Sequence, residues 1–217
     1  DFWYEYRQVV PKGYTRLLGK LAELSDAGIP MNFFVGNHDM WMRDYFQKEL
    51  NMPVYFKPEY FERQGKKFLI GHGDGLGPGD HGYKRLKKIF RNPVCKWLFG
   101  VFPPALGMGL ANYLSRRSRG QTGSTERVFL GEDKEWLIIY SKEVLAKEKV
   151  DFFVFGHRHL PIDYRLFPTE APAKAGVSEA RYINLGDWIS YFTYAVFDGE
   201  IMELKSYKGN EDKIIRR

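Results

Sequence analysis

The stretch VDFFVFGHRH, residues 150–159, indicates both the fold class and the place of the functional site. Val150 to Phe155 is a mostly apolar run that stops at Gly156, which predicts a buried strand that ends in a loop. Two earlier stretches repeat this design, MNFFVGNHD at residues 31–39 and KKFLIGHGD at residues 66–74. In all three, an apolar strand is followed by glycine and then by polar side chains of the types that can serve as ligands.

Predicted helices alternate with these strands. Residues Gly13–Ala27 carry leucines at helical spacing, with Gly28 placed as a C-cap, and a second helix is expected from about Glu132 to Lys147. Alternating helices and strands predict an α/β fold, whose sites form beyond the carboxyl ends of the strands. Any one histidine there could be an ordinary hydrogen-bonded loop residue. Equivalent positions after three strands favour a shared site built from His38, His72, His157 and His159.

The last third of the chain has a different pattern. Short strands are expected at Arg181–Asn184, Tyr191–Phe197 and Ile201–Tyr207, the last two joined by a hairpin turn at Asp198-Gly199. Residues 168–177 are predicted to form an exposed loop, and the charged segment 208–217 to be frayed.

Composition excludes several classes of protein. The chain has 217 residues, of which 44% are hydrophobic and 17% aromatic, so it can build a core and is not disordered. Its single cysteine, Cys95, excludes an internal disulfide and a cysteine-based zinc site, and it favours a reducing cytosol. No apolar run is long enough to cross a membrane.

A basic segment interrupts the chain at residues 81–125. It contains nine Lys or Arg and no Asp or Glu; subtracting these nine from the 33 cations of the chain leaves 24 against 27 carboxylates. The segment is also rich in apolar residues, which suits contact with an anionic lipid surface, although an ordinary helical subdomain would have the same composition. Pro103-Pro104 must break any helix here, so two helices could enclose a groove lined by Trp97, Phe99, Phe102, Leu106 and Leu110.

The candidate metal ligands are neutral donors. Asn37, His72, His157 and His159 suit Mn, Fe, Zn or Ni better than Mg or Ca. Two adjacent dications would also need bridging carboxylates. The aspartates near these motifs have other plausible roles, so the bridging carboxylates are expected upstream of Asp1.

The order Gly-Asn-His-Asp, Gly-His, Gly-His-X-His resembles the last three blocks of the calcineurin-like metallophosphoesterases. The resemblance implies a four-layer fold of two packed mixed β-sheets flanked by helices, here one domain over residues 1–217. That domain would lack its N-terminal Asp-X-His and Gly-Asp blocks and carry a helical cap insertion at about residues 80–125. By position, Asn37, His72 and His157 would bind one divalent ion and His159 a second. His38, oriented by Asp39, would face the phosphate as a catalytic residue. Mn²⁺ is the first candidate for both ions, with Fe or Zn as alternatives.

Within these phosphoesterases the chain is similar to the UDP-2,3-diacylglucosamine pyrophosphohydrolases of the lipid A pathway in Gram-negative bacteria. The similarity rests on the basic apolar insert and on the motifs around residues 72–83, 156–161 and 184–188. It implies hydrolysis of the substrate's diphosphate to UMP and 2,3-diacylglucosamine 1-phosphate. The substrate-binding residues would be Asn37, Asp80, Tyr83, Arg116 and Arg117. The better-known members have Arg where this chain has His38.

The partners implied are an acylated UDP-sugar and an anionic membrane surface, without nucleic acid or an obligate protein partner. The protein would then work in the cytoplasm, on the inner face of the inner membrane. Two alternatives remain: the same fold acting on another phosphodiester or nucleotide, and a non-catalytic membrane-associated scaffold. A nucleic-acid binder is disfavoured because few aromatics alternate with the cations of the insert.

Overall fold

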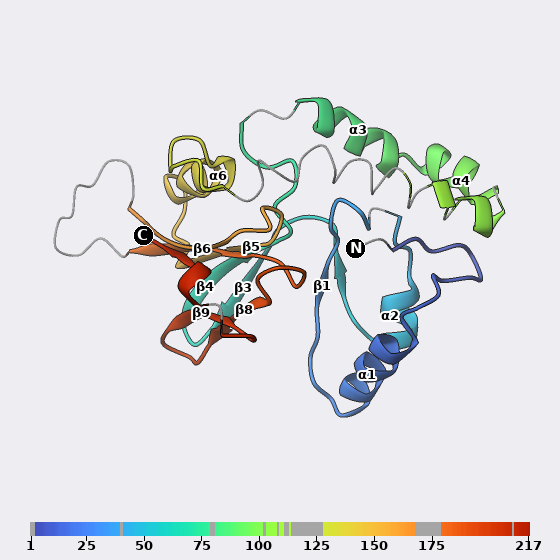
Figure 1. The fold of residues 1–217 in the computed structure, drawn as a ribbon, viewed down its shortest axis with the longest axis horizontal. Coiled ribbons are helices and arrows are strands. Elements are labelled where there is room, and N and C mark those ends of the chain that lie inside the picture. The colour runs from blue at the N-terminus through green and yellow to red at the C-terminus, as the bar shows by residue number, and fades with distance from the viewer. Residues whose placement is uncertain are drawn as a thin grey trace. The chain divides into compact units, whose positions relative to one another are not determined.

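The computed structural model (Figure 1) describes residues 3–39, 41–78, 81–101, 103–107, 109–110, 113, 128–167, 179–209 and 211–217. The chain divides into two compact units. Unit 1 comprises Asp1–Lys57 and Asp80–Thr122, and unit 2 comprises Pro58–Gly79 and Gly123–Arg217. The prediction of a single domain with an insertion stays a prediction. The chain contains both α-helices and β-strands, which confirms the predicted α/β class.

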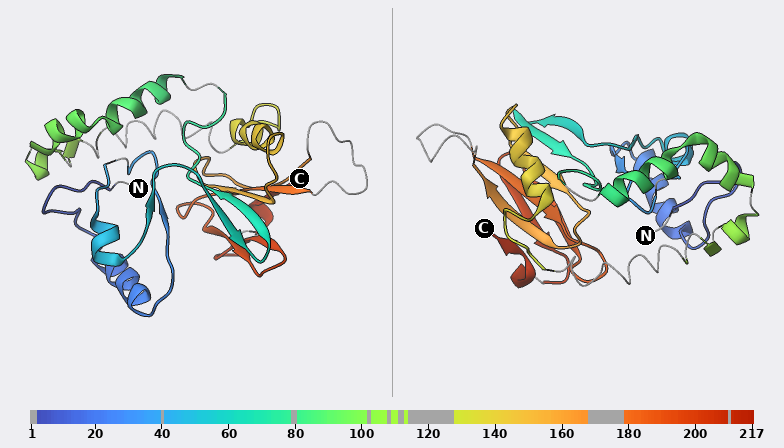
Figure 2. Two further views of the ribbon diagram at one scale, coloured as in Figure 1. Left: turned by 180° about the vertical axis from the view of Figure 1, so that it is seen from behind. Right: turned by 90° about the horizontal axis from the view of Figure 1, so that it is seen from above.

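Unit 2 is built on a mixed six-stranded sheet in the order β10-β6-β7-β5-β4-β3. Its centre is parallel: β4 pairs with β5, and β5 with β7. The edge strand β3 is antiparallel to β4 (Figure 2), and β6 is antiparallel to β7. The bounds of the strands are β3 Glu59–Arg63, β4 Lys66–Ile70, β5 Phe152–Phe155, β6 Pro161–Leu166, β7 Ala180–Leu185 and β10 Ile215–Arg216.

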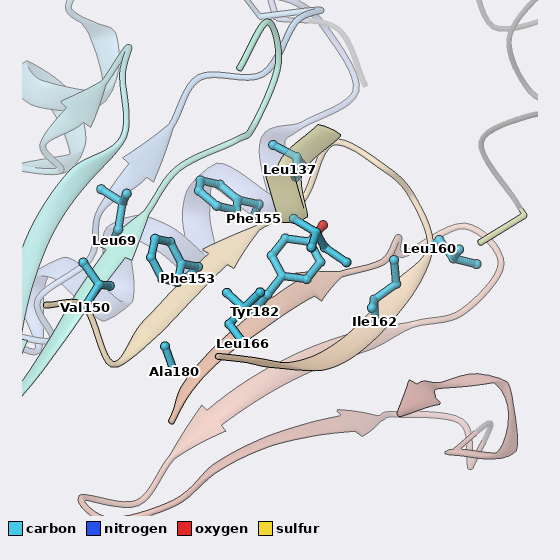
Figure 3. Close-up of a cluster of buried hydrophobic side chains, with 11 residues drawn as sticks. Leu69, Leu137, Val150, Phe153, Phe155, Leu160, Ile162, Leu166, Ala180 and Tyr182 are labelled. Atoms are coloured by element: carbon cyan, nitrogen blue, oxygen red, sulfur yellow. The ribbon is translucent and has the colours of Figure 1, made fainter. Parts of the chain in front are cut away.

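The two faces of this sheet are covered differently. Helix α6 (Trp136–Leu145) lies across one face, where Leu137 packs in a cluster with Phe153 and Phe155 (Figures 1 and 3). The hairpin of β8 (Thr193–Phe197) and β9 (Met202–Ser206) supplies Met202 and Leu204 to a second cluster, which contains Phe152 and other alternate strand residues. Because successive strand residues point to opposite faces, one apolar run such as 152–155 feeds both cores.

Unit 1 combines a small parallel sheet with helices. Strand β1 (Phe33–Phe34) pairs with β2 (Val54–Tyr55), and helices α1 (Thr15–Asp26) and α2 (Tyr45–Leu50) belong to the same unit. Gly28 has φ +75°, as expected for the predicted C-cap. The core of this unit consists of Trp3, Val35, Met42, Phe46, Leu50 and Met52.

The basic segment is helical where it is described. Helix α3 (His81–Arg91) is followed after the single residue Asn92 by α4 (Pro93–Val101), and helical residues resume at Pro104. The predicted break at Pro103-Pro104 is therefore confirmed. Among the described residues, no helix has the length and apolarity required to span a bilayer.

Two expectations need correction. The segment 208–217 is not simply frayed, because a 3-10 helix (Glu211–Lys213) and β10 lie in it and Ile214 is buried in the second core cluster. The groove lining also differs, since the Phe99 ring packs with its centroid 4.2 Å from that of Trp41 inside unit 1. Trp97, Leu106 and Leu110 are exposed, whereas Phe102 and the loop 168–177 fall outside the described residues.

Candidate metal centre

Two predicted ligands of unit 2 lie side by side. His72 follows β4 and His157 follows β5, and these two strands are neighbours in parallel register. The carbonyl of His72 accepts hydrogen bonds from the backbone N–H groups of Gly156, at 3.0 Å, and His157, at 2.9 Å. The centroids of the two imidazole rings are 5.1 Å apart. The convergence of these two strand ends is therefore confirmed.

The orientation of His72 is set by a carboxylate. Asp74 is 6% exposed, and its Oδ1 lies 2.9 Å from Nδ1 of His72. A carboxylate acceptor favours the tautomer with the proton on Nδ1, which leaves the Nε2 lone pair for a ligand. This carboxylate–histidine arrangement is the usual support for a metal-binding imidazole. Asp74 thus orients the His72 ring.

The electrostatics of His157 also fit metal binding. Its burial, and next the neighbouring His72, lower the pKa of His157 to about 3. Because removal from water disfavours the charged imidazolium, His157 is neutral at physiological pH. The neutral form is the one that binds a metal ion.

His159 occupies an unusual backbone conformation. Its φ is +52°, in the left-handed region, and its Nδ1 lies 3.9 Å from Oδ2 of Asp187. Asp187 is held by its own loop, since its Oδ1 accepts the backbone N–H groups of Ser190 at 2.6 Å and Tyr191 at 3.0 Å. Asp187 therefore places a fixed negative charge near the His159 ring.

The donors of unit 2 have the right chemistry for a divalent transition metal, although they form only part of a shell. In the described part of the chain, no group of three or more His, Cys, Asp or Glu is arranged to hold a metal ion. The rings of His157 and of the Asp74-bound His72 nevertheless lie next to each other, with their centroids 5.1 Å apart. A complete site needs further ligands.

Three of the predicted site residues lie in the N-terminal part of unit 1, before Lys57. Asn37 and His38 occupy a turn that is separated from the end of β1 by two residues, and both are half-buried. Asp39 accepts a hydrogen bond from the backbone N–H of Trp3 at 2.9 Å. That Asp39 orients His38, and that Asn37 shares an ion with His72 and His157, both stay predictions.

Four further predicted residues belong to the segment 80–122 of unit 1. Asp80, Arg116 and Arg117 lie outside the described residues, as does the side chain of Tyr83, whose backbone belongs to α3. Sequence reasoning missed a buried ion pair next to the site, Arg158 with Glu135. The available signal was a charged side chain in the variable position of Gly-His-X-His.

The chain resembles named proteins over most of its length, although no protein-family model matches it. A UDP-2,3-diacylglucosamine hydrolase of Porphyromonas gingivalis is 40% identical over 225 residues, which is 97% of this chain and 81% of the relative. Hydrolases of the same name from Pseudomonas putida and Ectopseudomonas mendocina are 30% and 29% identical, over 76% and 85% of this chain. The matches span 65% and 72% of those two relatives. Because one such hydrolase matches nearly the whole chain, the protein belongs to the UDP-2,3-diacylglucosamine hydrolase family.

Proposed function

We propose that this protein hydrolyses the diphosphate of UDP-2,3-diacylglucosamine to UMP and 2,3-diacylglucosamine 1-phosphate, a step of lipid A biosynthesis, and that it needs divalent metal ions. One observation carries the chemistry: a neutral His157 beside an Asp74-oriented His72 at the ends of two parallel strands. The name of the relatives supports the substrate.

The proposed metal ligands are those that the motifs indicate. Asn37, His72 and His157 would hold one ion and His159 a second, with Mn²⁺ as the first candidate and Fe or Zn as alternatives. When bound, such ions activate water and offset negative charge on the phosphoryl oxygens. The chain's own residues position the reaction: Asp74 keeps the proton on Nδ1 of His72, and His38, oriented by Asp39, faces the phosphate.

The substrate would be held by residues near the insert. We assign Asn37, Asp80, Tyr83, Arg116 and Arg117 to the UDP-sugar. The finer parts of the fold, four layers and a helical cap at about residues 80–125, belong to the same proposal. Helices α3 and α4 support the cap, because both lie within that segment.

The surface of the insert supports a role with lipid. Exposed apolar side chains follow one another along α4 and the next helical residues: Val94, Trp97, Leu98, Val101, Leu106 and Leu110. Helix α3 adds five cations and no carboxylate. Apolar groups beside cations would bind acyl chains and an anionic membrane, so we place the protein in the cytoplasm on the inner face of the inner membrane.

The test compares two substrates with protein made from its full reading frame and supplied with Mn²⁺. Each buried methylene contributes about 0.8 kcal/mol, so kcat/KM for UDP-2,3-diacylglucosamine should exceed that for UDP-N-acetylglucosamine by several powers of ten. His72→Ala should abolish turnover and reduce bound metal, whereas Tyr194→Ala on β8 should change neither.

Three outcomes would contradict the proposal. Equal kcat/KM for the two substrates would remove the lipid assignment and favour another phosphodiester or nucleotide. Metal binding without any turnover would favour a non-catalytic scaffold. Full activity of His72→Ala would remove the proposed metal centre.

A further inference from the structure

Arg158 lies between the two histidines of the Gly-His-X-His motif, yet its side chain is turned into the interior of unit 2 and is only 1% exposed. Its Nε donates to Oε2 of Glu135 at 2.9 Å, and its Nη2 donates to Oε1 of Glu135 at 3.0 Å. The same Nη2 donates to the carbonyl of Val128 at 2.8 Å. The guanidinium also stands 5.1 Å from the ring centroid of Trp136. The Arg158 guanidinium is thus held by a carboxylate and a backbone carbonyl, with an aromatic ring beside it.

Glu135 ties this arginine to the start of helix α6. It is fully buried and occupies the position before the first helical residue. Its backbone carbonyl accepts the N–H groups of Ile138 and Ile139, and its Oε1 also accepts the N–H of Leu130 at 3.0 Å. A rigid helix end therefore fixes the carboxylate, and the carboxylate fixes Arg158.

The loop that carries the two histidines is constrained from its other side as well. The carbonyl of His72 holds the N–H groups of Gly156 and His157, and the N–H of His159 donates to the carbonyl of Gly156 at 3.2 Å. His159 is in the left-handed region, which is unfavourable for a residue with a Cβ. A conformation of this kind persists where its surroundings impose it. The side chain of Arg158, the residue before it, is anchored by its hydrogen bonds to Glu135 and Val128.

We propose that the Arg158–Glu135 pair positions His157 and His159 for metal binding, an inference that rests on the function proposed above. A two-pronged guanidinium–carboxylate contact fixes direction as well as distance. A buried ion pair stabilises a fold no better than well-packed apolar residues of similar volume, so stability alone does not account for it here. Arg158 and Glu135 are positioning residues, because they act through the histidines.

The experiment replaces both charges with apolar groups in the full-length protein, as Arg158→Met with Glu135→Leu. Mn²⁺ affinity is measured by isothermal titration calorimetry, and folding by thermal unfolding of the metal-free protein. We expect the melting temperature to change little and the Mn²⁺ affinity to fall about 10- to 100-fold, as for other outer partners of metal ligands.

A matched control exists in the same sheet. Arg181 forms a two-pronged ion pair with Asp163. Arg181 lies opposite Phe152 at the start of β5, whereas the histidine loop follows the other end of that strand. The double variant Arg181→Met with Asp163→Leu should leave Mn²⁺ affinity unchanged.

The outcomes separate the two proposals. Wild-type affinity in a folded Arg158→Met, Glu135→Leu protein would overturn the positioning role, as would an equal loss in the control pair. If the double variant does not fold, the single variant Arg158→Lys tests the positioning role, since it keeps the positive charge but loses the two-pronged contact with Glu135. A severalfold lower Mn²⁺ affinity supports the role, and an unchanged affinity overturns it. A wild-type protein that binds no Mn²⁺ would instead refute the proposed function, and with it this inference.

Discussion

Asp74 contacts Nδ1 of His72, so a single buried carboxylate favours one tautomer of a residue two positions away. The hydrogen bond between them measures 2.9 Å and both side chains lie beyond the end of β4. Sequence reasoning identified His72 from its position after a strand. It did not assign this role to Asp74, because a contact between two side chains of one loop depends on rotamers that periodicity does not reveal.

Replacing Asp74 by Asn should weaken metal binding while preserving the fold. The amide oxygen can still accept from His72 Nδ1, but it carries no charge and so raises the basicity of the imidazole less. We expect Mn²⁺ affinity to fall about tenfold, the low end of the range for such partners. Titration with Mn²⁺ checks this, and an affinity equal to wild type would contradict it.

Gly186 offers a second test at the scale of one residue. Its φ is +73°, and a Cβ there would come to 2.5 Å from Oγ1 of Thr193. Gly186→Ala should therefore lower the free energy of unfolding by more than the roughly 1–2 kcal/mol expected from the backbone conformation alone. Gly209→Ala is the control, because Gly209 has φ +70° with nothing within 4 Å of the added Cβ. Urea unfolding of both variants measures the difference, and equal losses would refute the steric explanation.

An N-cap residue separates helices α3 and α4 of the insert. Asn92 stands between α3 and α4, and its Oδ1 accepts the backbone N–H groups of Val94 at 2.8 Å and Cys95 at 3.3 Å. Pro93 follows as the first helical residue, where its missing N–H costs nothing. Asn92 and Pro93 together mark the start of α4.

Asn92→Ala should remove these two hydrogen bonds and destabilise α4 by about 1 kcal/mol, whereas Asn92→Asp should retain them. Hydrogen exchange of the amides at the start of α4 is the direct measurement. Faster exchange in the Ala variant, and wild-type exchange in the Asp variant, are the expected results. Equal protection in all three proteins would show that the cap is dispensable.

Elements with a clear period or apolar run could be predicted from the sequence. The strand at residues 66–70 was predicted with its observed bounds, and the helix at residues 13–27 and the hairpin 191–207 were close to theirs. Strands β6 and β10 were not predicted. These two strands pair with each other although they lie far apart in the sequence, and the Arg217 N–H donates to the Asp163 carbonyl at 3.0 Å. Local sequence patterns carry little information about such distant partners.

At the scale of the whole molecule, charge is distributed unevenly along the sequence. Residues 81–125 contain nine cations and no carboxylate, whereas the rest of the chain has slightly more carboxylates than cations. Arg85 and Lys88 are exposed on α3, in the same segment as the exposed apolar side chains of α4. Attraction to an anionic surface should therefore depend on this segment rather than on total charge.

Arg85→Gln with Lys88→Gln should weaken binding to vesicles that contain phosphatidylglycerol by about 1 kcal/mol for each cation removed. Arg63→Gln with Lys147→Gln removes the same charge from exposed positions of unit 2 and should have little effect. Vesicle co-sedimentation at two salt concentrations measures both. Equal losses from the two pairs would mean that net charge alone governs binding.

Hydrogen bonds between Lys67 of β4 and Asp151, the residue before β5, hold together two positions that are far apart in the sequence. Asp151 and Lys67 are 84 residues apart, yet the Lys67 N–H donates to the Asp151 carboxylate at 2.8 Å and the Asp151 N–H donates to the Lys67 carbonyl at 2.8 Å. Everything between them, including α3 and α4, is one closed loop in the sense of polymer physics. The entropy of closing such a loop grows only with the logarithm of its length, so doubling it costs about 0.6 kcal/mol. The sheet that carries His72 and His157 can therefore keep its register while the segment between the end of β4 and the start of β5 lengthens, shortens or changes sequence, which leaves that segment free to diversify while the two histidines keep their places.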